Sequence, residues 1–90
     1  MAQLITQDGT RQVKPENGKD FKLQELYKLL NCQMIQVIDL PKKQIMIFDE
    51  EGKCKDHYLN EAATTIAGDS IGSDDYIAGH ALVCKQSELK

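Results

Sequence analysis

Met34–Phe48 reads Met-Ile-Gln-Val-Ile-Asp-Leu-Pro-Lys-Lys-Gln-Ile-Met-Ile-Phe, and we expect the other elements of the chain to pack around this stretch. Two apolar, β-branched runs of five and four residues, Met34–Ile38 and Ile45–Phe48, flank a polar joint. Runs of this length are typical of strands and too short for an independent helix. Pro41 in the joint has no N–H to donate, so it belongs in a connection between strands. The stretch therefore predicts a β-hairpin, and because neither run alternates cleanly, both strands are expected to be interior.

A more polar hairpin is expected before this stretch. Gln3–Thr6 leads into Asp8-Gly9, a strong turn dipeptide, and Thr10–Lys14 returns as a second strand with Val13 pointing inward.

The clearest helix follows this first hairpin. One face of a 3.6-residue period is formed by four apolar residues: Leu23, Leu26, Tyr27 and Leu30. Asp20 is the expected N-cap, Glu25 is expected to reach back toward the helix start, and Asn31 suits a left-handed C-terminal position. We expect this helix to lie across one face of the sheet, with its apolar stripe in the core.

The second half of the chain is also predicted to contain strands and a helix. A strand over Lys53–Tyr58 would extend the central hairpin into a meander. Asn60 is expected to cap a short helix that ends at Gly68 and carries Ala62, Ala63, Ile66 and Ala67. A surface loop at Asp69–Asp75, a last buried strand within Tyr76–Lys85 and a loose tail at Gln86–Lys90 complete the chain.

These elements predict one domain over residues 1–90 with an α+β fold in the order ββαββαβ. A β-grasp-like sheet packed on one long helix is the favoured architecture, and another small α+β sandwich with one helix on an open sheet is the alternative. Fold alone does not identify function.

Composition and charge exclude several classes of partner. The net charge is −3 and the longest basic run is Lys42-Lys43, so we expect no direct nucleic-acid binding. No apolar run approaches the roughly 20 residues that span a bilayer, and the chain start lacks the features of a signal peptide. The three cysteines fit a reduced compartment, so we expect a location in the host cytoplasm and no membrane association.

No residue pattern identifies a reaction. Cys32, Cys54 and Cys84 form no C-x-x-C pair, and the only local metal cue is Cys54 with His57. Cys84 lies in an apolar run, where burial would raise the pKa of its thiol and make it inert. We therefore expect no catalytic residue, no metal and no cofactor, and the protein is not predicted to be an enzyme.

Five short signatures carry a resemblance to a known family. In chain order they are Asp8-Gly9, Pro15–Gly18 before Phe21–Leu26, Asp49–Lys53, Asn60–Ala63 and Ile77–Val83. Together they resemble a family of small uncharacterised domains carried by bacteriophages, plasmids and their hosts. The resemblance covers nearly the whole chain, but its motifs are turns and caps, and Lys22 stands where similar sequences often have a Thr suited to capping. It implies a shared fold and a mobile-element accessory protein, a class that includes inhibitors of bacterial defence such as anti-CRISPR proteins, with no catalytic residue to carry over.

With no chemical site in view, the surface is the expected functional part. We expect a non-enzymatic phage or mobile-element protein that binds and inhibits a host protein. The expected target is a defence complex of the kind that anti-CRISPR proteins inhibit. The candidate partner-binding residues are the acidic turns and the exposed aromatics: Glu50, Glu51, Tyr58, Asp74, Asp75 and Tyr76. Two alternatives stay open, a sponge that sequesters a nucleotide signal, with its site between subunits of a homo-oligomer, and a small metal- or Cys/His-dependent hydrolase.

Overall fold

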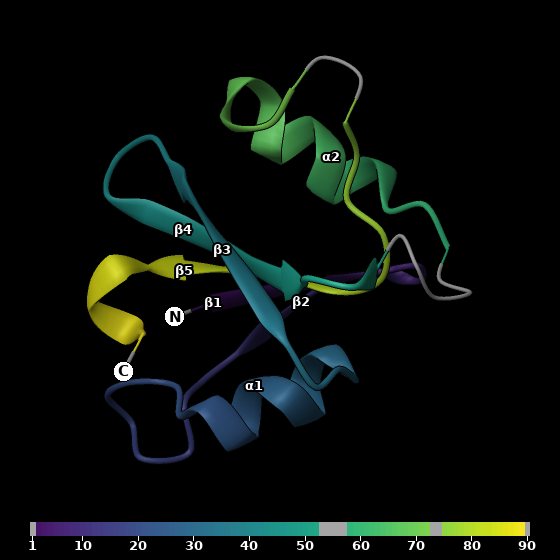
Figure 1. Ribbon diagram of the computed structural model, residues 1–90. Coiled ribbons are helices and arrows are strands. Elements are labelled where there is room, and N and C mark those ends of the chain that lie inside the picture. Colours follow the sequence, from purple (N-terminus) through teal and green to yellow (C-terminus); the bar gives the residue numbers. More distant parts are fainter. Residues whose placement is uncertain (1, 53–57, 73–74, 90) are drawn as a thin grey trace.

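A single antiparallel sheet of five strands forms the centre of the molecule, in the spatial order β2-β1-β5-β4-β3 (Figure 1). The computed structural model describes residues 2–52, 58–72 and 75–89. Its strands are β1 (Ala2–Thr6), β2 (Gly9–Val13), β3 (Ile35–Leu40), β4 (Gln44–Asp49) and β5 (Ala81–Lys85). Its helical segments are α1 (Leu23–Leu30), α2 (Glu61–Ala67) and the short 3-10 turns η2 (Gly68–Ser70) and η3 (Gln86–Glu88). The α+β class and the order ββαββαβ are confirmed.

The central hairpin forms as predicted, with β3 and β4 paired in register from Ile35 opposite Asp49 to Leu40 opposite Gln44. Pro41 lies in the connection. The prediction that both strands are interior is correct for β4, which pairs with β3 and β5 and is buried from Ile45 onward. It is wrong for β3, which is an outer strand of the sheet and in which only Leu40 is buried.

Helix α1 covers one face of the sheet and closes the first of two cores. Leu26 and Leu30 are buried there against β1, β4 and β5 residues such as Leu4, Ile47 and Leu82. Tyr27 packs against the same cluster as a partly buried residue. The prediction that Leu23 belongs to the buried apolar stripe is wrong, since this residue is 49% exposed. Phe21, just before the helix, is fully buried and fills the core at this end instead.

The prediction for the C-terminal end of α1 is confirmed, and the predicted N-cap is wrong. Asn31 has φ of 52° and ends the helix in the left-handed conformation, as expected. The N-cap position belongs to Lys22 and not to Asp20, whose Oδ1 accepts a hydrogen bond from the Asn17 side chain at 2.9 Å. Glu25 does reach back, since its Oε1 accepts the Lys22 N–H at 3.4 Å and its Oε2 accepts the Glu16 N–H at 2.9 Å.

Helix α2 covers the opposite face of the sheet and closes the second core (Figure 1). Ala63 and Ala67 are buried against Ile5, Met46 and other residues of the strands, whereas Ile66 points outward and is 44% exposed. Asn60 caps the helix and Gly68 ends it, as predicted. Because helices cover both faces, the sheet is enclosed between α1 and α2 and does not wrap a single helix.

The C-terminal segment is docked, so the prediction of a loose tail at Gln86–Lys90 is wrong for the part that the structure describes. The Phe21 N–H donates to the Glu88 carbonyl oxygen at 2.6 Å, and Leu89 forms a bridge with Phe21 and packs against the first core. The last strand is shorter than expected and begins at Ala81. The strand expected at Lys53–Tyr58 lies, except for Tyr58, outside the described residues. Within the described ranges, no helix has the length and apolar character needed to cross a bilayer.

Candidate functional site

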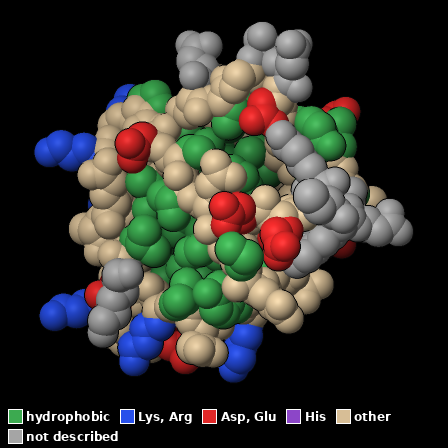
Figure 2. Space-filling model, in the orientation of Figure 1, with side chains coloured by type: hydrophobic (Ala, Val, Ile, Leu, Met, Phe, Trp, Pro, Cys, Tyr) green, Lys and Arg blue, Asp and Glu red, His purple; other side chains and the backbone are tan. Residues whose placement is uncertain are grey.

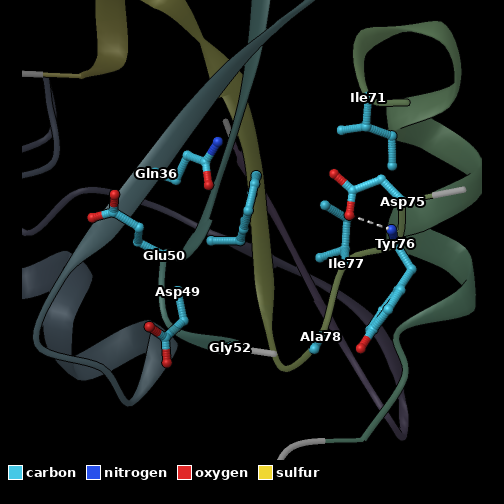
Figure 3. Close-up of a pocket in the computed structure, with 10 residues that line it drawn as sticks. Gln36, Asp49, Glu50, Gly52, Ile71, Asp75, Tyr76, Ile77 and Ala78 are labelled. Carbon is cyan, nitrogen blue, oxygen red and sulfur yellow. Dashed lines mark hydrogen bonds between the residues drawn. The ribbon is translucent and has the colours of Figure 1, made fainter. Parts of the chain in front are cut away.

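A pocket of about 100 Å³ lies where the end of β4 meets the segment that leads into β5 (Figure 3). We call it the acidic pocket. Its walls come from three parts of the chain: Gln36 of β3, residues Phe48, Asp49, Glu50 and Gly52 at and after the end of β4, and Ile71, Asp75, Tyr76, Ile77 and Ala78 before β5. In Figure 3, Asp49 and Glu50 lie on one side of the pocket, and Asp75 and Tyr76 lie on the other.

Gly52 brings the two walls together. It is buried, and a Cβ built on it would lie 2.7 Å from the carbonyl oxygen of Ala78. Real Cβ atoms do not approach oxygen so closely, so the turn after β4 can pack against the backbone of Ala78 only when this residue has no side chain. The glycine is therefore required by a close approach between two segments, in addition to any role in the turn.

Backbone N–H groups bind the carboxylates of Asp49 and Asp75, and the backbone of Glu50 is bonded to Met34. Asp49 is 3% exposed, and its Oδ1 accepts the Glu51 N–H at 2.9 Å. The Glu50 N–H donates to the carbonyl oxygen of Met34 at 3.1 Å, which fixes this turn to the start of β3. On the other side, Asp75 Oδ1 accepts the Tyr76 N–H at 2.8 Å, the bond drawn in Figure 3.

Asn60 anchors the wall that carries Asp75 and Tyr76. Its side chain is buried, donates to the carbonyl oxygens of Ile5 at 3.1 Å and Gly79 at 2.8 Å, and accepts the Ala63 N–H at 3.0 Å. Its backbone N–H donates to the Ile77 carbonyl oxygen at 2.9 Å. One buried amide thus connects β1, α2 and the segment before β5, and every polar atom of that amide is satisfied.

Thr64 adds a second connection between α2 and the pocket wall. Its hydroxyl donates to the Asn60 carbonyl oxygen at 2.8 Å and accepts the Ile77 N–H at 2.8 Å. The exposed residues of the pocket wall are consequently held by α2 and not by the loop alone.

The structure brings together half of the six predicted partner-binding residues. Glu50, Asp75 and Tyr76 line the acidic pocket, and all three are exposed. Glu51 is exposed in the same turn but does not line the pocket. Tyr58 belongs to a different contact, described below, and Asp74 lies outside the described residues.

The candidate partner-binding residues predicted from the sequence do not include Asp49 or Gln36, and the close approach of Gly52 was not predicted. A signal for two of them was present, because Gln36 interrupts an apolar run and Asp49 directly follows one. Nothing in the local sequence pairs Gly52 with Ala78, which lies 26 positions later in the chain.

Acidic residues on both walls give the acidic pocket a negative formal charge. Asp49, Glu50 and Asp75 line it together with Tyr76 and apolar side chains such as Phe48 and Ile77, although in Figure 3 the carboxylates of Asp49 and Glu50 point away from Asp75. Its volume corresponds to about three water molecules at ~30 Å³ each and lies below the ~300–1,000 Å³ of usual small-molecule pockets. A lysine ammonium or an arginine guanidinium fits these dimensions and charges.

A second contact joins Tyr58 to His80. The Tyr58 hydroxyl lies 2.9 Å from His80 Nδ1, and the two rings are 5.9 Å apart at an angle of 56°. Burial raises the pKa of the Tyr58 hydroxyl, and the nearby Asp8 carboxylate adds to the rise, although a backbone hydrogen bond at Gln7 opposes it. Tyr58 therefore stays protonated at neutral pH and acts here as a hydrogen-bonding ring that ties two segments together.

The Cys84 thiol is buried and protonated at neutral pH. Burial raises the pKa of Cys84 to about 11, and the negative charge of Glu88 acts in the same direction. This rise confirms the prediction for Cys84, since a thiol with such a pKa is protonated at neutral pH. Cys32 is also buried, and Cys54 and His57 lie outside the described residues. Within residues 2–52, 58–72 and 75–89, no three His, Cys, Asp or Glu side chains gather in a way that could hold a metal ion.

Comparison with known proteins places the chain in a family. Searches among curated proteins and among solved structures each found no match. A protein-family model matches residues 1–89, and its description is "Domain of unknown function (DUF3846)". This agrees with the resemblance to a family of small uncharacterised domains. Because the match covers almost the whole chain, the protein belongs to the DUF3846 family.

Proposed function

We propose that this protein is a non-enzymatic binding protein that docks on a host protein through the acidic pocket. The observation that carries the proposal is the convergence of Glu50, Asp75 and Tyr76, three residues of two separate segments, around one small cavity. Interfaces are anchored by a few aromatic and charged residues that meet a complementary side chain of the partner. The anchor that this pocket would accept is a lysine or an arginine.

Exposed apolar side chains support protein docking. On the face seen in Figure 2, hydrophobic side chains and carboxylates lie together, and the Lys and Arg side chains lie at the margin. Tyr76 is 39% exposed, and Met34, whose carbonyl oxygen binds the Glu50 N–H, is 49% exposed. A standard interface of about 800 Å² per partner would occupy roughly one seventh of the 5876 Å² surface.

The rigid support of the pocket also favours binding. Glu50 is fixed to β3, and the opposite wall is fixed to α2 through Asn60 and Thr64. Side chains carried on a preorganised backbone lose less conformational entropy when a partner binds, which favours affinity.

The class of target follows from the resemblance to small domains of bacteriophages and plasmids. We propose that the host protein belongs to a bacterial defence complex, so that the chain acts as an inhibitor of the anti-CRISPR kind in the host cytoplasm. A host protein that binds nucleic acid contacts the phosphates with lysine and arginine side chains, and a negatively charged pocket would compete for them.

Affinity capture from a native bacterial host, followed by mass spectrometry, tests the proposal. Wild-type protein should retain a specific partner, and a variant with Glu50→Lys and Asp75→Lys should lose it because the charge of the pocket is reversed. A matched control with Glu16→Lys and Asp39→Lys makes the same change of charge at exposed positions outside the pocket and should retain the partner. Equal capture by the pocket variant and the control would refute the role of the pocket.

A functional assay tests the target class. Expression of the wild-type protein should restore plaque formation by a phage that the host's defence system otherwise blocks, and the pocket variant should not. If neither protein changes plaque formation in hosts with any defence system tested, the inhibitor assignment is wrong, even when a host partner has been captured.

A further inference from the structure

A cluster of three lysines lies at the end of the central hairpin that is opposite the acidic pocket. Lys42 and Lys43 are in the turn between β3 and β4, and Lys85 is the last residue of β5. Together with Gln44, Gln86 and Ser87 they line a pocket of about 380 Å³. We call this site the basic corner.

The sheet builds the basic corner from two distant parts of the chain. Gln44 pairs with Lys85 in the register of β4 and β5, so the hairpin turn and the start of η3 are neighbours. The Gln86 N–H donates to the carbonyl oxygen of Lys43 at 3.1 Å, which ties the two segments together. The backbone segments that carry the three lysines are therefore neighbours, and all three residues line one space.

The charged side chains among the described residues that line the basic corner are all lysines. No Asp or Glu of the described residues lines it. The acidic residue closest to it in sequence, Glu88, is largely buried, and its Oε1 accepts the Lys85 N–H at 3.0 Å. In a chain with a net charge of −3, three lysines around a pocket without a carboxylate are a local concentration of positive charge.

The turn places two lysines in a backbone conformation that lysine seldom adopts. Lys42 and Lys43 have φ of 63° and 61°, in the left-handed region where Gly and Asn are preferred. A glycine at either position would adopt this conformation without the steric cost of a Cβ. The chain has two lysines where the backbone geometry alone would favour other residues.

We propose that the basic corner binds a small phosphate-bearing ligand. Three ammonium groups match the charge of a di- or triphosphate, and the amide and hydroxyl groups of Gln44, Gln86 and Ser87 supply further hydrogen-bond donors. The volume of about 380 Å³ lies within the usual ~300–1,000 Å³ range of small-molecule pockets. The site is separate from the acidic pocket, so this inference does not depend on the proposed function.

Titration with tripolyphosphate, followed by amide chemical shifts in NMR at about 50 mM NaCl, where screening is weak, tests the proposal. Saturable shifts should be concentrated at residues 42–44 and 85–87. A variant with Lys42→Ala, Lys43→Ala and Lys85→Ala should bind at least about tenfold more weakly, because three close attractive charges are removed. A control with Lys14→Ala, Lys19→Ala and Lys28→Ala has the same net charge, alters only exposed residues outside the pocket, and should bind like the wild type.

A second variant separates loss of binding from loss of folding. Lys42→Gly with Lys43→Gly removes two ammonium groups but relaxes the left-handed backbone, so its Tm should equal or exceed that of the wild type while its affinity falls. Unchanged affinity in this folded variant would overturn the proposal. Three other results would also overturn the proposal. They are chemical shifts that do not saturate, a control variant that binds as weakly as the triple-lysine variant, and tighter binding of a single-stranded oligonucleotide than of tripolyphosphate.

Discussion

Substitution of Gly52 by alanine should destabilise the protein and separate the two walls of the acidic pocket. The new Cβ would lie 2.7 Å from the Ala78 carbonyl oxygen and 3.5 Å from its carbonyl carbon and Cβ. The first distance is well inside van der Waals contact, and the atom approached is backbone, which cannot rotate away. Overpacking of this kind costs about 1–3 kcal/mol, so Tm should fall by roughly 4–20 °C for a domain of this size.

Gly72→Ala is the matched control for this experiment. Gly72 belongs to the segment that leads to the same pocket, but a Cβ there would be 4.0 Å from the Cβ of Asp75, an ordinary contact. Its effect should lie within about 0.5 kcal/mol of the wild type. Urea denaturation followed by circular dichroism gives the free energy of unfolding for both variants. If Gly52→Ala is as stable as the wild type, or if the two substitutions cost the same, the close approach does not constrain this turn as argued.

Three further perturbations test other parts of the structure. Asn60→Ala should lower the free energy of unfolding by about 2–4 kcal/mol, because it removes the N-cap acceptor and the donor to the carbonyl oxygens of Ile5 and Gly79; a loss below about 0.5 kcal/mol in urea denaturation would contradict the role of this amide. The pKa of Cys84 is raised in the folded protein from 9.0 to about 11. The contribution of this thiol to stability is therefore present below pH 9 and is lost as the pH rises toward 11. Cys84→Ala should flatten this part of the curve of unfolding free energy against pH. Removal of residues 86–90 should cost about 1–3 kcal/mol, because the Phe21 N–H loses the Glu88 carbonyl oxygen and the first core loses Leu89; a truncated chain with unchanged Tm would mean that the C-terminal turn does not stabilise the fold.

The candidate site was only partly predictable because its residues are adjacent in space and not in sequence. Glu50, Asp75 and Tyr76 were identified separately as exposed charged or aromatic residues in turns. Their convergence depends on Gly52 packing against Ala78, and no local pattern encodes a contact between two turns. The basic corner is a similar case, since Lys42-Lys43 is visible as a short basic run but Lys85 joins it only through the pairing of β4 with β5.

Local sequence patterns predicted both helices, the central hairpin and some of the ends, but not the N-cap of α1 or the start of β5. Hydrophobic periodicity, Pro41 in a connection, the cap at Asn60 and the left-handed end at Asn31 depend on interactions between residues a few positions apart. Tertiary structure alone decided that β3 is an edge strand, that Leu23 is exposed while Phe21 is buried, that helices cover both faces and that the tail is docked on Phe21. The physical reason is that burial is settled by competition among all apolar groups of the chain for two limited cores. That competition depends on how distant segments pack.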